Sequence, residues 1–370
     1  MIRRIFVSFG FLICSLCSFG GEVDSNYVAK FKNIFAVKGF LINNGFIYTL
    51  TPRNNSFYSP QQLKDAEVIY SAHIPTTAGV SLNIKGVGFT YVFKFTDDYL
   101  DTTGRVRSGF KQFQMNIYGN KFGFEGYYQD YSRFYFHYKG DEILLKNYNN
   151  DIRAYQFGAN GIFIFNGHKF SYNAAFNQTQ FQKKSAGSGL MMISLKYNEL
   201  QSNHLIPDSV DQFFSGYSAL QKNRNYGFLL QGGYAFNLTK KNFYYSTALL
   251  AGAGIQFQSY SFPIDKFYKI GFPLIGRVKS SMGYNGKVFF TGIFGNFDVS
   301  QSYIHSVKTQ QLIYSYGVYV GFRAIEMQKY KKSRKQLQEE AKEKKAKEAA
   351  AKKKLKEDKK KAAKEKKRKK

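Results

Sequence analysis

The sequence predicts an all-β fold, an antiparallel up-and-down transmembrane β-barrel of about twelve strands, followed by a lysine-rich helical or irregular tail. Three observations support it. Long segments alternate apolar with small or polar residues, tight polar turns join many of them, and 18% of the chain is aromatic. The mean hydropathy of −0.39 is compatible with this fold, because only every second residue of a membrane barrel faces lipid.

Residues 1–20 are predicted to form a signal peptide. A short basic stretch precedes an apolar run from Ile5 to Phe19, and small residues stand before a possible cleavage site at Gly21. The run is shorter than the roughly 20 residues that a membrane helix needs. Both cysteines, Cys14 and Cys17, lie in this run. The exported chain would therefore have no thiol for a disulfide, a metal site or a nucleophile.

Residues 21–327 are predicted to form the barrel. Between residues 226 and 238, for example, the even positions are mostly aromatic or aliphatic and the odd positions mostly small or polar. Several such segments exceed the roughly 5–6 residues of an ordinary strand and reach the about 9–11 that a tilted membrane strand needs. Tight turns are expected at 166–168, 239–242 and 285–286, and longer connections at 201–225 and 261–267.

The strand count is predicted as twelve, within a range of ten to fourteen, because a single bacterial chain usually forms an even-stranded barrel. The predicted strands start near residues 34, 77, 109, 122, 153, 169, 189, 224, 243, 269, 288 and 311. Long connections at 96–108 and 137–152 break the expected alternation of short and long loops, and Asn44-Gly45 could form an additional hairpin.

A secreted soluble β-sandwich is the alternative fold. It would need a second layer to cover its aromatic faces, yet nearly every predicted strand offers one apolar face. Lipid covers such an exterior, and a closed barrel leaves no unpaired backbone edge. The membrane barrel is therefore favoured.

No arrangement of residues in the sequence indicates catalysis. The five histidines are scattered without metal-ligand spacing, and neither a nucleophile elbow nor a phosphate loop occurs. We therefore expect no catalytic, cofactor-binding or metal-binding residue and no cofactor. The rival hypothesis is a lipid-modifying outer-membrane enzyme on the same scaffold, with a serine and a histidine at the barrel rim.

Charged residues at positions predicted to face inward define a candidate lumen. They are Glu125, Arg133, Arg153, Arg277, Lys279 and Arg323. Positive charges prevail, so one interpretation is a narrow pore that favours anionic solutes. The other, which is favoured, is a salt-bridged plug of side chains, since barrels of this size are often filled. A shift of one residue would turn any of these side chains to the opposite face.

Residues 328–370 form a polybasic tail with 22 Lys or Arg and 7 Asp or Glu. Its Ala, Lys and Glu favour a solvated helix, and Glu343 with Lys347 and Glu348 with Lys352 are favourable pairs. An even-stranded barrel leaves both ends in the periplasm, where the tail could contact peptidoglycan or anionic headgroups. A solubilising extension without a specific partner is the alternative. Export argues against nucleic acid as a partner.

Several segments resemble a known family. They are Phe122 to Tyr128, Asp151-Ile152, Gly161 to Asn166, Lys169 to Gln178, Gln182 to Ser188 and Leu205 to Pro207. They are similar to the domain of unknown function 4421 family of Bacteroidota envelope proteins, regarded as outer-membrane barrels, and the resemblance covers most of residues 30–325. It implies a location in the outer membrane and a barrel fold, but no activity and no functional residues.

The most specific part of the resemblance is a basic turn with small residues. It comprises Gln182, Lys183, Lys184, Ser185, Ala186, Gly187 and Ser188. We regard it as a candidate functional turn between two strands. The alternative is a turn whose residues serve geometry alone, with Ser, Gly and Ala allowing a tight backbone and Lys keeping it in water.

Taken together, the sequence predicts an exported outer-membrane barrel whose physiological role is unassigned and is structural or narrow-pore rather than enzymatic. Such a barrel would contact membrane lipid, and the barrel-assembly machinery during its biogenesis.

Overall fold

The computed structural model describes residues 23–31, 34–53, 56–84, 86–94, 107–138, 147–214, 216–304 and 306–325. The predicted signal peptide and the predicted polybasic tail lie outside the described residues.

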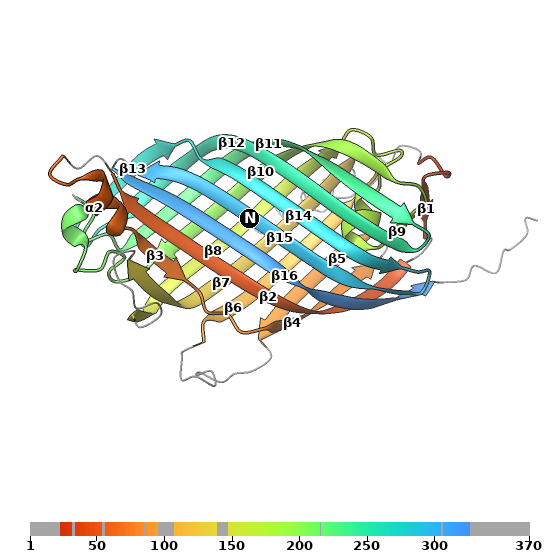
Figure 1. Ribbon diagram of the computed structural model, residues 1–370, viewed down its shortest axis with the longest axis horizontal. Coiled ribbons are helices and arrows are strands. Elements are labelled where there is room, and N and C mark those ends of the chain that lie inside the picture. The colour runs from red at the N-terminus through yellow and green to blue at the C-terminus, as the bar shows by residue number, and fades with distance from the viewer. Residues whose placement is uncertain are drawn as a thin grey trace, which may run out of the picture. The chain divides into compact units, whose positions relative to one another are not determined.

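Twelve antiparallel strands of the described chain close into a barrel, and they run obliquely around it (Figure 1). They are β2 (Ile34–Pro52), β4 (Thr77–Ile84), β5 (Val87–Lys94), β6 (Gly109–Tyr118), β7 (Phe122–Tyr138), β8 (Asn147–Ile164), β10 (Ala186–Gln201), β11 (Lys222–Lys240), β12 (Phe243–Ser261), β14 (Leu274–Asn285), β15 (Phe289–Ile304) and β16 (Val307–Ile325). Each strand pairs with the next, and β16 closes on β2 with Ile325 opposite Ile34. The predicted fold class is confirmed.

The two ends of the barrel differ. The end at which β2 starts and β16 finishes is called the terminus end, and the opposite one, which carries the long connections, the loop end. At the terminus end most connections are short. The β4–β5 turn uses Gly86 at φ +94°, a conformation that suits glycine. Longer segments join β2 to β4 and β10 to β11 at the loop end.

The remaining elements lie on or within the barrel. They are β1 (Val28–Lys30), which pairs with β9 (Gln180–Gln182); β3 (Val68–Ser71), which pairs with both β2 and β7; β13 (Lys266–Gly271), which pairs with β12; the helix α2 (Pro60–Asp65); the π-helical turn η1 (Asn173–Asn177); and the 3-10 turn η2 (Asp211–Phe213). Ser59 and Gln62 form a capping box at the start of α2. No helix among the described residues is long and apolar enough to span a membrane.

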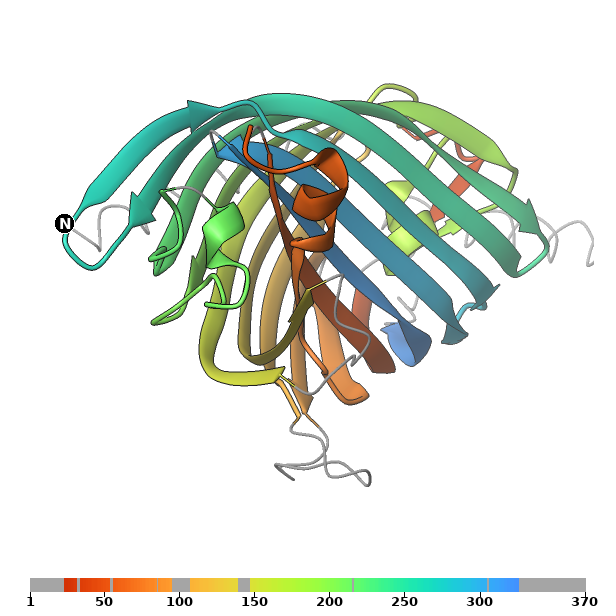
Figure 2. The same ribbon diagram turned by 60° about the vertical axis from the view of Figure 1, so that its left-hand side comes forward.

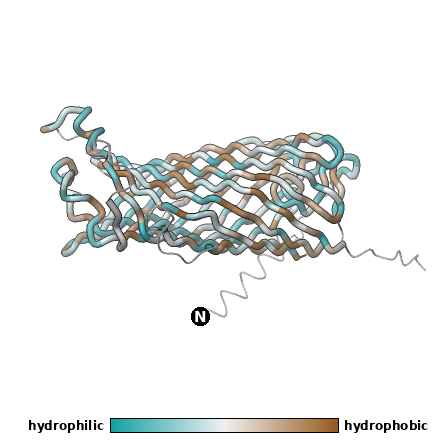
Figure 3. The backbone as a smooth tube through the Cα atoms, turned by 60° about the horizontal axis from the view of Figure 1, so that its bottom comes forward, coloured by the Kyte–Doolittle hydropathy of each residue, from teal (hydrophilic) through white to brown (hydrophobic). Residues whose placement is uncertain are grey.

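The exterior of the barrel is apolar. On β11 the outward Tyr226, Phe228 and Leu230 are about half exposed, whereas the inward Leu229 and Gln231 are buried. Every one of the twelve strands carries at least one large apolar side chain exposed in this way, and the alternation is visible along the strands in Figure 3. A closed hydrogen-bond ring with an apolar outer face is the architecture of an outer-membrane barrel.

The number of strands is as predicted, but two strand positions were wrong. The strand expected near residue 169 does not exist, because residues 165–185 fold into the barrel and contain η1. The strand β5 was missed, because the turn at Gly86 splits the segment after residue 77 into two strands. Asn44-Gly45 forms no hairpin and lies within the single 19-residue strand β2.

Candidate functional site

The middle of the barrel contains a polar chamber of about 210 Å³. A cavity needs roughly 10–15 Å³ of such volume to hold one water molecule, so the chamber has room for a small solute. Its charged lining residues are Lys38, Glu125, Lys196, Arg277, Lys279 and Asp298. Four cations against two carboxylates leave an excess of two positive charges.

Glu125 on β7 is the centre of an ion-pair cluster in the chamber. Its carboxylate lies 3.2 Å from the Lys279 Nζ and 4.0 Å from a guanidinium nitrogen of Arg277. It also accepts hydrogen bonds from the Tyr118 hydroxyl and from the Asn160 amide at 3.2 Å. Only 6% of the residue is exposed, and these four partners replace the water that the buried carboxylate lacks.

Arg277 joins this cluster to a second carboxylate. Its guanidinium donates to both carboxylate oxygens of Asp298, at 2.5 and 3.3 Å. Two cations and two carboxylates thus compensate one another across β7, β14 and β15.

Two further lysines, Lys38 on β2 and Lys196 on β10, supply the excess charge. Within the described residues neither has a carboxylate within ion-pair distance. The Lys38 Nζ lies 5.3 Å from the centre of the Tyr319 ring, which offers a weaker, cation–π interaction. An uncompensated ammonium inside a barrel is costly unless water or an anion solvates it.

Residues 165–185, called the plug, close the terminus end of the chamber. The short yellow-green helix inside the ring of strands in Figure 2 belongs to it. Phe170, Tyr172 and Phe176 pack there against inward side chains of β8, β10, β11 and β12. The ammonium of Lys279 lies 5.4 and 5.1 Å from the Tyr172 and Phe176 ring centres, so the plug forms the floor of the chamber.

Polar contacts to several strands fasten the plug. The Asn173 amide donates to the Tyr118 carbonyl at 2.7 Å and the Asn177 amide to the Asn116 side chain at 2.9 Å. The Asn285 amide donates to the Gln180 carbonyl at 3.1 Å. The plug is thus held by β6 and by the end of β14.

Arg323, the last charged residue of β16 to be described, fixes the plug from a fully buried position, with 2% exposed. Its guanidinium donates to the Gln178 carbonyl at 2.7 Å and also to the Gly286 carbonyl. It lies between Phe31 and Phe290, 4.7 and 4.3 Å from their ring centres. Gln178 has a left-handed φ of +56°, a strained conformation that its surroundings must maintain.

The candidate turn 182–188 connects β9 to β10 and anchors the exit of the plug. Gln182 donates to the Lys169 carbonyl at 2.6 Å and accepts from the Ser171 amide at 2.9 Å. Ser185 accepts from the Thr239 amide at 2.9 Å, and Lys183 donates to the Ser25 carbonyl at 2.8 Å. The remaining members are Lys184, whose ammonium lies 5.5 Å from the Tyr27 ring centre; Ser188, which accepts from the Asn166 amide; and Ala186 and Gly187 at the start of β10.

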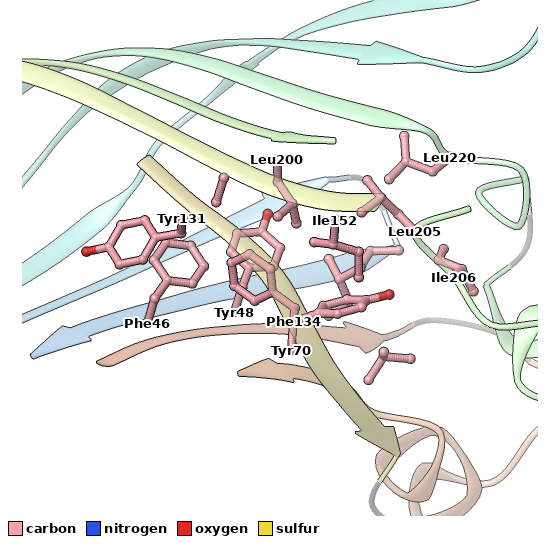
Figure 4. Packing of buried hydrophobic residues seen from close by; sticks show 14 of the residues in the cluster. Phe46, Tyr48, Tyr70, Tyr131, Phe134, Ile152, Leu200, Leu205, Ile206 and Leu220 are labelled. Atoms are coloured by element: carbon pink, nitrogen blue, oxygen red, sulfur yellow. The ribbon is translucent and has the colours of Figure 1, made fainter. Parts of the chain in front are cut away.

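An aromatic and aliphatic cluster closes the loop end (Figure 4). Phe46, Tyr131 and Phe134 come from barrel strands, and the rings of Phe46 and Tyr131 are 4.8 Å apart. Leu205 and Ile206, both fully buried, come from the segment between β10 and β11. Strand β3 contributes further members by bridging β2 and β7 above the shorter strands β4 to β6.

Of the six predicted lumen residues, four lie inside the barrel and two do not line the chamber or the plug. Glu125, Arg277 and Lys279 meet in the chamber, and Arg323 lies inside the barrel at the plug. The assignment of Arg153 was wrong, because on β8 the even residues face inward and Arg153 is exposed on the outer face. Arg133 is not a chamber residue either; it occupies a bulge at φ +65°, where the register shifts and the alternation is interrupted.

Three chamber charges were missed in the sequence: Lys38, Lys196 and Asp298. Each alternates with exposed apolar neighbours such as Val37, Leu195 and Phe297. This alternation in the sequence could have identified the three charged side chains as inward-facing.

A serine and a histidine meet at the loop end, through the backbone of the histidine. The Ser202 hydroxyl lies 3.1 Å from both Asp151 carboxylate oxygens and contacts the backbone of His204. The His204 ring instead faces Asp208 at 3.3 Å. In the part of the chain that the structure describes, no three His, Cys, Asp or Glu side chains are grouped to hold a metal ion.

A family model described as "Domain of unknown function (DUF4421)" matches residues 22–323. A search of curated proteins gives no match. Among solved structures, the outer membrane protease OmpT from Escherichia coli is 6% identical, with 79% of this chain and 97% of that chain covered and a TM-score of 0.37. The outer membrane protein OpdK from Pseudomonas aeruginosa is 7% identical, with 78% and 98% covered and a TM-score of 0.19. Scores this low bear on neither role nor substrate.

Proposed function

The chain belongs to the domain of unknown function 4421 family, whose description names no activity, and we therefore propose a role from the geometry of the chain itself. The proposed role is a gated, narrow pore of the outer membrane for small polar solutes. The structure would represent the closed state, in which the plug separates the chamber from the terminus end.

The observation that carries the proposal is the position of the chamber. Six charged side chains line a cavity that lies between two apolar clusters inside a membrane barrel. A barrel with a purely structural role would gain from an apolar filling, because replacing a buried ion pair with hydrophobic residues is often neutral or stabilising by roughly 1–4 kcal/mol. A polar chamber is better explained by the passage of water and solute.

The plug is the element that suits a gate. It is a contiguous segment between β8 and β10, so it can move without breaking the hydrogen-bond ring of the barrel. Its contacts with the barrel include polar side-chain contacts at a few points, Arg323 among them. The plug also packs against apolar inward side chains of β6, β8, β10, β11 and β12, and the loop-end cluster draws residues from still more strands.

Cross-linking the plug tests this role. The Asn116 and Asn177 side chains are hydrogen-bonded at 2.9 Å, and the only cysteines of the chain are Cys14 and Cys17. Cysteines at 116 and 177, bridged through two disulfide bonds by a short bis-methanethiosulfonate reagent, should abolish opening in planar bilayers, and reduction of these disulfides should restore it. A variant in which a Gly-Ser linker replaces residues 167–184 should open more often than the wild type, because the loop-end cluster then remains as the barrier at one end of the chamber. Failure of this second variant to open more often would contradict the proposal.

We also propose that the terminus end faces the periplasm, so that the tail 328–370 contacts peptidoglycan or anionic lipid. The net positive charge of the tail supports this, since each basic residue near an anionic surface contributes about 1 kcal/mol. Deleting residues 328–370 should reduce sedimentation with isolated cell wall and with anionic liposomes. Unchanged sedimentation in both assays would leave the tail as a solubilising extension.

A further inference from the structure

We propose that the chamber is a binding site for a small hydroxylated anion, recognised by Lys196 together with Gln156 and by a row of inward amide side chains. The proposal names the solute class of the pore proposed above and rests on it, since the ligand must enter through an opened end.

Lys196 and Gln156 are neighbours on the inner face of the barrel. Lys196 is paired with Gly158, and Gln156 with Asn198, so the two side chains are diagonal partners on β10 and β8. Such partners have Cβ atoms somewhat less than about 7–8 Å apart, a spacing that lets an ammonium and an amide reach one carboxylate or phosphate group. Both residues line the chamber.

Each of the two has an unused donor. Lys196 has no carboxylate within ion-pair distance among the described residues. The Gln156 Nε2 has no hydrogen-bond partner although only 3% of the residue is exposed. Buried donors normally find partners. An anion bound between the two groups would satisfy both.

The nearby carboxylates are already engaged. Asp298 accepts two hydrogen bonds from the Arg277 guanidinium, and Glu125 is held by Lys279, Tyr118 and Asn160. Lys38 adds a second unpaired ammonium to the same chamber. The excess of two positive charges therefore remains available to a ligand.

A row of amides extends from this site. Six consecutive strands carry an inward Gln or Asn at directly paired positions: Gln112, Gln129, Gln156, Asn198, Asn225 and Gln258. Gln112, Gln129 and Gln156 line the chamber, whereas Gln258 contacts Tyr260 of the loop-end cluster. Because the strands are tilted (Figure 1), the row leads obliquely from the chamber toward the loop end.

The chemistry of the row selects the ligand class. An amide offers both donors and an acceptor, as hydroxyl groups require, and the Asn225 Oδ1 is a further buried atom without a partner. A charged group at Lys196 with hydroxyl groups along the amides describes a sugar acid or a similar small hydroxylated anion. Neutral sugars would lack the contact with Lys196.

The test uses glucuronate as the anionic probe and glucose as its neutral counterpart, with the full chain in detergent. Binding is measured by calorimetry on the wild type and on the variant whose plug is replaced by a linker. We expect glucuronate to bind at least tenfold more tightly than glucose, Lys196→Met to weaken it at least tenfold, and Gln156→Leu severalfold. Lys266→Met, an exposed change on β13 with the same loss of charge, is the matched control.

Equal binding of glucuronate and glucose, an unaffected Lys196→Met variant, or no binding even after plug replacement would overturn the site. A gel-mobility check on each variant confirms that the barrel is folded. Glucuronate binding without any ionic current would contradict the pore and leave the site standing. Current without glucuronate binding would contradict the site and leave the pore standing.

Discussion

At the residue scale, charged side chains are buried inside the barrel in two different settings. Glu125, Arg277, Lys279 and Asp298 neutralise one another in the chamber, whereas Arg323 is buried among carbonyl groups and aromatic rings. The first arrangement shapes the interior of a cavity. The second holds a separate segment in place. The two sets of charges therefore have different roles and should respond differently to substitution.

Replacing Arg323 should release the plug and leave the barrel folded. Arg323→Met removes the donors to the Gln178 and Gly286 carbonyls, and buried unpaired acceptors cost roughly 1–3 kcal/mol each. Trypsin should then cut the folded protein after Lys169, which is half-buried with the plug in place, faster than it cuts the wild type. Arg153→Met, on the exposed outer face, should leave cleavage unchanged. Equal protection in both variants would contradict the role of Arg323.

The chamber cluster should show strong coupling. Glu125→Gln should lower the free energy of unfolding by about 3 kcal/mol, because it leaves buried cations without their partner. Adding Lys279→Met to Glu125→Gln should restore a large part of the lost free energy of unfolding, so a double-mutant cycle should give a large coupling energy for this pair. The more exposed Glu199–Arg224 pair, at 2.7 Å, should couple by less than about 1 kcal/mol. Urea denaturation in liposomes measures both cycles, and equal coupling energies would contradict the distinction.

At the element scale, alternation in the sequence predicts most strands, because each inward or outward position has a distinct environment. It fails where an aromatic segment faces the interior. Phe170, Tyr172 and Phe176 pack inside the barrel rather than toward lipid, and a pattern of apolar residues does not tell the two apart. The same limit applies to Asn44-Gly45, a hairpin dipeptide that here continues a strand.

Gly45 has a reason of its own to be glycine. A Cβ atom at this position would lie 2.0 Å from the Tyr314 ring on the neighbouring strand. Gly45→Ala should therefore push the outer end of this ring aside and destabilise the barrel by about 1 kcal/mol. Gly39→Ala on the same strand, where nothing lies within 4 Å, should be nearly neutral. Similar denaturation midpoints for the two variants would contradict this explanation.

At the scale of the whole molecule, the closed barrel, its strand number and its apolar exterior were predictable, since they follow from local alternation and strand length. The chamber was only partly predictable. The inward direction of Glu125, Arg277 and Lys279 was predicted from the alternation along their strands. The contacts among them, however, depend on closure of the barrel and on the plug beneath them. Contacts between strands distant in sequence, such as β7 and β14, leave no local signature.

The barrel should behave as one folded unit in membranes. Extracted from the outer-membrane fraction, the chain should migrate faster on SDS gels before boiling than after, because a closed hydrogen-bond ring resists the detergent. Truncation after residue 327 should preserve this shift, since the last described strand ends at Ile325. Identical migration before and after boiling, with release from membranes by salt, would contradict the membrane barrel.

The most direct test of the account asks whether the plug separates the chamber from the terminus end. Ser315, which lines the chamber, is replaced by cysteine in a background without other cysteines in the exported chain. The rate of labelling by a small charged thiol reagent, added from the terminus side, is then measured. We expect slow labelling with the plug intact and labelling at least tenfold faster when a linker replaces residues 167–184. Equal rates with and without the plug would contradict a gated chamber.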